Sequence, residues 1–94
     1  MGLSYEEFEL TESAYRHGYD DEDVAELLRG RHLLFRSRRG RQFGYEFLGR
    51  NGAAEYLLIV GRVVESKGQK ILRIFHIDRM PENDRKRYQR QIGQ

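Results

Sequence analysis

The residues of this sequence best suited to chemistry are its three histidines and fourteen arginines. His76 and Asp78 alternate with apolar residues in a strand-like segment, so their side chains should share one face of that strand. Both residue types bind metals, but a metal site needs at least a third donor, and the spacing supplies none. We therefore expect no metal and no cofactor, and we take His76 as a candidate general acid or base near neutral pH. His17 precedes Gly18 at an expected helix end, where it should cap carbonyl groups.

Several common catalytic motifs are missing from the sequence. Gly40, Gly44 and Gly49 lie in an expected hairpin region and open no helix, so they form no nucleotide-binding loop. There is no nucleophile elbow, and without cysteine there is no Cys/His pair. The sequence therefore gives no support to the common serine and cysteine hydrolases.

Several of the arginines fall on the segments that alternate like β-strands or in the turns beside them, with aromatic residues between them. Guanidinium groups bind phosphate through two parallel hydrogen bonds, and unstacked RNA bases stack on aromatic rings or on guanidinium planes. This combination predicts RNA binding by Arg36, Arg38, Arg41, Arg62 and Arg73. The alternative is that the aromatic rings belong to the core and that the arginine side chains cover them.

Two helices are predicted in the N-terminal third of the chain. After an extended segment over residues 5–10, Thr11 is a suitable N-cap for a short helix that continues through Arg16. Asp20 is the expected N-cap of a second helix, because three further acids follow it in the first turn, and Gly30 ends that helix.

From His32 onward the apolar residues alternate with polar ones, which indicates β-strands. The expected strands cover residues 32–38, 43–49, 57–64 and 69–78. Their short connections favour antiparallel pairing. Pro81 fits the first turn of a C-terminal helix through Ile92, which has Tyr88 and Ile92 as its apolar face. The prediction is an α+β fold with two N-terminal helices, a four-stranded antiparallel sheet and a C-terminal helix.

Length and composition limit the architecture further. With 94 residues, 38% of them hydrophobic, residues 1–94 should form one domain with a small core, which excludes a two-domain enzyme. The longest apolar run, Tyr56–Val60, is far shorter than the roughly 20 residues of a membrane-spanning helix. The absence of cysteine fits a reducing compartment. We therefore expect a soluble cytoplasmic protein that does not enter the membrane.

Charge is unevenly distributed along the chain. Residues 1–28 contain nine acids and one base, a net charge of −8, whereas residues 29–94 contain sixteen bases and six acids, a net charge of +10. A polyanion such as RNA is a natural partner for the basic part. The alternative is that the acidic part covers the basic part within the same molecule.

Short motifs in a fixed order extend over nearly the whole chain. They are His17-Gly18 before an acidic helix, Phe47-Leu48-Gly49-Arg50, Leu57-Leu58-Ile59-Val60, Ile74-Phe75-His76-Ile77 and Asp84-Arg85-x-x-Tyr88. This order resembles the BrnT-type toxins of bacterial toxin-antitoxin modules, which are similar to the RelE/ParE superfamily. The family commonly has arginine shortly after the final strand with serine or alanine before it, whereas Ile77-Asp78-Arg79-Met80 inserts an acid at that point.

The resemblance implies a single BrnT/RelE-like toxin domain over residues 1–94. It implies a metal-independent endoribonuclease that cleaves RNA by attack of the 2′-hydroxyl, and a cognate DNA-binding antitoxin as a second partner besides RNA. Two alternatives stay open. One is a non-catalytic nucleic-acid-binding or gyrase-inhibiting module of the same superfamily, and the other is a decayed relative with a structural role.

A phosphate-handling cluster is predicted from the last strand and the helix after it. If Phe75 and Ile77 enter the core, His76 and Asp78 face the other side, where neighbouring segments can add arginines. The predicted catalytic residues are Arg50, His76, Arg79, Arg85 and Tyr88. His76 would act as general acid or base, the arginines would stabilise the transition state, and Tyr88 would position the phosphate or donate a proton. Alternatively, Tyr88 packs the helix and His76 forms an ordinary ion pair with Asp78.

Overall fold

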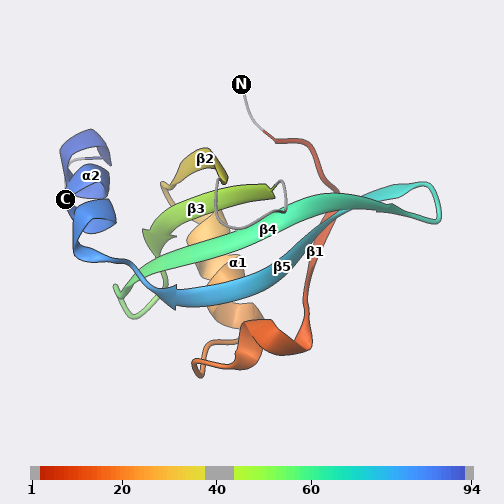
Figure 1. Ribbon diagram of the computed structural model, residues 1–94, viewed down its shortest axis with the longest axis horizontal. Coiled ribbons are helices and arrows are strands. Elements are labelled where there is room, and N and C mark those ends of the chain that lie inside the picture. Colours follow the sequence, from red (N-terminus) through yellow and green to blue (C-terminus); the bar gives the residue numbers. More distant parts are fainter. Residues whose placement is uncertain (1–2, 38–43, 93–94) are drawn as a thin grey trace.

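A five-stranded mixed sheet forms the centre of the computed structural model, which describes residues 3–37 and 44–92 (Figure 1). In chain order the elements are β1 (Glu7–Leu10), the 3-10 turn η1 (Glu12–Tyr15), α1 (Asp21–Arg29), β2 (Leu33–Ser37), β3 (Gly44–Arg50), β4 (Tyr56–Ser66), β5 (Gln69–Arg79) and α2 (Glu82–Ile92). The strand order is β1-β5-β4-β3-β2, in which β1 runs parallel to β5 and the other pairs are antiparallel.

The predicted four-stranded antiparallel sheet is wrong, although β2 to β5 lie where strands were expected. The extended segment before Thr11 contributes a fifth strand, in which Glu7 is the partner of Ile71 and Leu10 is the partner of Ile74. This parallel pairing joins residues far apart in the sequence, so no local turn motif could have predicted it. Leu10 and Phe8 pack against the core and stabilise the added strand.

The prediction of two N-terminal helices is also wrong, because the first is only a four-residue 3-10 turn. The Thr11 side chain caps no backbone N–H group, and its hydroxyl lies 3.0 Å from the Ser13 hydroxyl instead. The second helix, α1, has a reciprocal capping box. The Asp23 N–H donates to Asp20 Oδ1 (3.1 Å), and the Asp20 N–H donates to Asp23 Oδ2 (3.0 Å).

The sheet has a buried cluster on each face. On the face covered by α1, here called the α1 face, the fully buried residues include Val24, Leu27, Phe47, Leu57, Ile59, Leu72, Ile74 and Ile77. The opposite face, here called the α2 face, carries Leu48, Leu58, Val60, Met80 and Tyr88. In Figure 1, α1 lies across the sheet, whereas α2 lies beyond one end of its strands. Among residues 3–37 and 44–92, no helix covers the rest of the α2 face.

A bulge in β5 changes which residues face which side. Val60 is the partner of His76 and Gly61 is the partner of Ile74, so Phe75 is the extra residue. A Cβ atom on Gly61 would lie 2.7 Å from the Arg73 carbonyl oxygen, so this close approach requires glycine. Phe75 packs on the α2 face and Ile77 on the α1 face, so the condition that both enter one core is not met.

Candidate functional site

Two arginines lie over the ring of Tyr56 where β4 begins, on the α2 face. The Arg85 Cζ lies 4.4 Å from the centroid of the Tyr56 ring, and the Arg50 Cζ lies 5.2 Å from it. Arg50 is the cross-strand partner of Tyr56, and Arg85 approaches from α2. Arg79, at the end of β5, pairs across the strands with Leu57 of the α1 face, and it lines a pocket of about 260 Å³ together with Glu55, Tyr56, Met80 and Arg85. We call Arg50, Tyr56, Arg79 and Arg85 the arginine-tyrosine cluster.

The surroundings of Tyr56 favour its ionised form. The Gln89 side-chain amide donates a hydrogen bond to the phenol oxygen (3.3 Å). This bond, together with the positive charges of Arg50 and Arg85, lowers the pKa of Tyr56 below its usual value of 10.0. The sequence prediction included the three arginines but not Tyr56. The signal that could have identified it is its position opposite Arg50 across the turn between two strands.

Tyr88 packs against Tyr56 and is only 3% exposed. The two rings form an edge-to-face pair with centroids 5.9 Å apart. The Tyr88 hydroxyl donates to the Arg31 carbonyl oxygen (3.1 Å), which connects α2 to the segment before β2. Burial and this hydrogen bond fit the alternative in which Tyr88 packs the helix and supports the ring of Tyr56.

His76 lies on β5, outside the arginine-tyrosine cluster. It shares the α2 face with Asp78, because their cross-strand partners, Val60 and Leu58, both belong to the buried cluster on that face. The His76 ring meets His17 edge to face, with centroids 5.8 Å apart and an interplanar angle of 84°. His17 Nε2 also lies 3.8 Å from Asp78 Oδ2. His17 was expected to cap a helix end, and the sequence carried no sign of this contact with β5.

The predicted RNA-binding arginines are not all in one place. Arg36 and Arg62 line a cavity of about 420 Å³ near the Tyr45 ring, and Lys70 adds a third cationic residue to its lining. Arg73 is the cross-strand partner of Arg62. Two further predicted residues, Arg38 and Arg41, lie outside the described residues.

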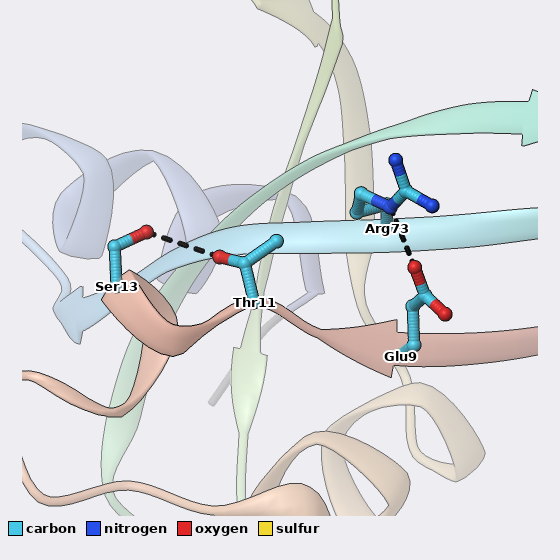
Figure 2. A network of polar contacts seen from close by, with 4 residues as sticks. All are labelled: Glu9, Thr11, Ser13 and Arg73. Carbon is cyan, nitrogen blue, oxygen red and sulfur yellow. Dashed lines mark hydrogen bonds and ion pairs between the residues drawn. The ribbon is translucent and has the colours of Figure 1, made fainter.

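Arg73 is engaged by the acidic N-terminal segment. Its Nε donates to Glu9 Oε2 at 2.5 Å, which joins β5 to β1 (Figure 2). Within residues 3–37 and 44–92, this is the one ion pair shown between acids of residues 1–28 and arginines of the basic part. The acids of α1 bind other groups, since Asp23 accepts from the Asn51 amide and Glu26 from the Gly52 N–H. Within the described residues, the alternative in which the acidic part covers the basic part has this one arginine ion pair in its favour.

The described residues hold no group of three or more His, Cys, Asp or Glu side chains placed to bind a metal ion. None of the helices in the described part of the chain is long and apolar enough to cross a membrane. Comparison of the chain with known protein families finds no match, and comparison with curated proteins finds none. The resemblance to BrnT-type toxins therefore stays a prediction.

Proposed function

We propose that the protein is the toxin of a bacterial toxin-antitoxin system and acts in the cytoplasm as a metal-independent endoribonuclease. The arginine-tyrosine cluster is the observation that carries this proposal. It presents two permanently charged guanidinium groups over one aromatic ring, and a third arginine, Arg79, lines the adjacent pocket together with the acidic Glu55. Guanidinium groups bind phosphate through paired hydrogen bonds, and an aromatic ring offers a surface on which a base can stack.

The reaction needs little from the protein because RNA carries its own nucleophile. The 2′-hydroxyl attacks the adjacent phosphorus, negative charge accumulates on the phosphate oxygens, and the 5′-oxygen leaves. Arg79 and Arg85, both exposed beside the pocket, would stabilise this charge. His76 would transfer a proton, since imidazole exchanges protons near neutral pH. Arg36 and Arg62 line a separate cavity with Tyr45, whose ring packs with the cluster of the α1 face, and they would be a second contact for the RNA chain.

The test is cleavage of a mixed RNA substrate by the purified protein in the presence of a chelator. We expect products with 2′,3′-cyclic phosphate ends. Arg85→Ala should lower the rate by about 10²-fold or more, because it removes a charge that stabilises the transition state. Arg85→Lys should restore the rate only in part, since lysine keeps the charge but not the planar fork. The matched control is Arg90→Ala, an exposed arginine of the same helix, which should cleave normally.

Two results would contradict the proposal. The first is no cleavage between pH 6 and 9, and the second is full activity of Arg85→Ala. RNA binding without cleavage would favour the non-catalytic nucleic-acid-binding alternative, and inhibition of gyrase supercoiling would favour the gyrase-inhibiting one.

The proposal also requires a partner that silences the toxin. We expect a stable complex with an antitoxin whose acidic or amphipathic segment covers the basic surface, because complementary charge steers association. Co-expression with the product of the adjacent gene should yield this complex and relieve growth arrest. If the protein alone causes no growth arrest and no complex is recovered, the toxin assignment loses its support.

A further inference from the structure

One carboxylate lies beside the arginine-tyrosine cluster, where phosphate binding alone would not favour it. Glu55 precedes β4 and lines the pocket of about 260 Å³ that Arg79 and Arg85 also line. This pocket lies where β4 begins and β5 ends, next to α2 (Figure 1). A negative charge repels the phosphate groups that the two arginines attract. A ligand that offers only phosphate oxygens therefore does not account for Glu55.

The side chain of Glu55 is held by the turn between β3 and β4. The Asn51 side-chain amide donates to Glu55 Oε1 (2.8 Å), and Asn51 Oδ1 accepts from the Glu55 backbone N–H (2.9 Å). Asn51 is 7% exposed, and its amide also donates to Asp23 Oδ1 of α1 (3.0 Å). A further bond to α1 runs from the Gly52 N–H to Glu26 Oε1 (2.7 Å). The carboxylate is thus positioned by a turn that is anchored to α1.

The arginines of the pocket do not pair with this carboxylate. Within residues 3–37 and 44–92, Glu55 forms no ion pair with Arg79 or Arg85, and its Oε2 has no hydrogen-bond partner. All three side chains belong to exposed residues. A carboxylate oxygen accepts up to two hydrogen bonds, so Oε2 and one lone pair of Oε1 are available to a ligand. The pocket therefore offers two positioned acceptors beside guanidinium donors.

Guanine is the RNA base that matches this combination most fully. Its N1–H and N2 amino groups form a pair of donors on one edge, and its O6 and N7 atoms form a pair of acceptors on another. A carboxylate accepts from the donor pair, and arginine donates to the acceptor pair. Adenine has an acceptor where guanine has the N1–H, so it would meet a carboxylate unfavourably. Cytosine and uracil each offer only one donor group to a carboxylate.

We infer that this pocket binds one guanine base of the RNA and that Glu55 recognises it, an inference that rests on the proposed function because it takes RNA as the ligand. The Glu55 carboxylate accepts from the N1–H and N2 amino groups, and Arg79 donates to O6 and N7. Met80, which is 7% exposed, gives the base an apolar contact. The pocket is smaller than the roughly 300–1,000 Å³ of sites for drug-sized ligands, which suits a single base. Arg85 stays available for the adjacent phosphate.

The test measures binding without cleavage. The ligands are single-stranded uridine oligonucleotides with one central guanosine, inosine, adenosine or cytidine. Their sugars carry 2′-fluorine, which removes the nucleophile, so that none of them can be cleaved. Fluorescence anisotropy gives the Kd of each. We expect the guanosine oligonucleotide to bind about 10-fold more tightly than the inosine one, because inosine lacks the N2 amino group and so loses a hydrogen bond to a charged acceptor. The adenosine and cytidine oligonucleotides should bind at least as weakly as the inosine one.

The substitution Glu55→Gln separates base recognition from a general effect of charge. Glutamine keeps an oxygen that accepts from the Asn51 amide, so the melting temperature should stay close to that of the wild type. The variant should bind the guanosine oligonucleotide about 10-fold more weakly and lose most of the preference over inosine. If the charge of Glu55 merely repels RNA, the variant should instead bind all four oligonucleotides more tightly. The matched control is Glu65→Gln, an exposed acid at the other end of β4, which should keep the preference for guanosine.

The outcomes separate the inference from the proposed function. Equal binding of the guanosine and inosine oligonucleotides by the wild type overturns the inference, and so does tighter binding of the adenosine or cytidine one. A Glu55→Gln protein that keeps the wild-type preference also overturns it. If RNA is cleaved in any of these cases, the ribonuclease proposal stands. Selective guanosine binding by a protein that cleaves no RNA supports the guanine pocket and contradicts the ribonuclease proposal. If none of the oligonucleotides binds, the inference is overturned and the proposal loses RNA as a ligand.

Discussion

The substitution Tyr88→Phe distinguishes a packing role for this residue from a catalytic one. The phenylalanine ring keeps the contacts with Tyr56 and the buried cluster of the α2 face but loses the hydroxyl that donates to the Arg31 carbonyl. Arg31 is exposed, so water can partly replace the lost donor. The cost should therefore lie near about 1 kcal/mol. In a chain of 94 residues this corresponds to a fall in melting temperature of roughly 4–8 °C.

Removing the whole ring should have a much larger effect. Tyr88 is 3% exposed and belongs to a buried cluster with Leu48, Leu58, Val60 and Met80. Truncation to alanine should destabilise the fold by about 3–5 kcal/mol. That is a large part of the roughly 5–15 kcal/mol by which a domain of this kind is stable.

Urea unfolding measures both changes, with the transition midpoint as the readout and a constant slope as the check on two-state behaviour. The matched control is Tyr15→Phe, which also loses a hydroxyl hydrogen bond, to Asp21, but at a residue that is 45% exposed, so the free energy of unfolding should change by no more than about 0.5 kcal/mol. RNA cleavage by Tyr88→Phe should persist. If Tyr88→Phe keeps the wild-type midpoint and loses cleavage, the packing argument is refuted and Tyr88 returns to the catalytic residues.

Three further predictions concern packing, charge and ionisation. In Gly49→Ala the new Cβ would lie 2.7 Å from Cγ of the fully buried Leu27, so unfolding should become easier by about 1–3 kcal/mol, and an unchanged urea midpoint would contradict this. Glu9→Gln releases Arg73 from its partly exposed ion pair, so stability should change by less than about 1 kcal/mol while RNA binding becomes more salt-dependent, by a slope of about 0.7 per added phosphate contact. An unchanged slope would show that Arg73 does not contact RNA. Because the pKa of Tyr56 is lowered, its phenol should ionise first as the pH rises, and ultraviolet titration of Tyr56→Phe should lack the earliest tyrosine phase. Identical titration curves would be evidence against the cluster geometry.

Local patterns in the sequence were sufficient to predict the elements whose stability depends on residues close to them in the chain. The capping box of α1 needs only Asp20 and Asp23, and α2 begins directly after Pro81. Strands β2 to β5 follow from period-two alternation, and the common face of His76 and Asp78 follows from their spacing within one strand. The sequence also predicted Arg50, Arg79 and Arg85 as site residues, from their places after two strands and on the last helix, and this assignment stays a prediction.

Tertiary structure decided everything that depends on contacts between distant segments. The parallel pairing of β1 with β5 depends on hydrogen bonds between segments more than sixty residues apart, such as Glu6 N–H to the Lys70 carbonyl (2.8 Å). Tyr56 is the centre of the arginine-tyrosine cluster because the fold places β3, β4 and α2 next to one another. His17 reached His76 only through the attachment of η1 to β5. A periodic pattern records which face of an element is apolar, but the partner of that face is selected by the packing energy of the whole chain.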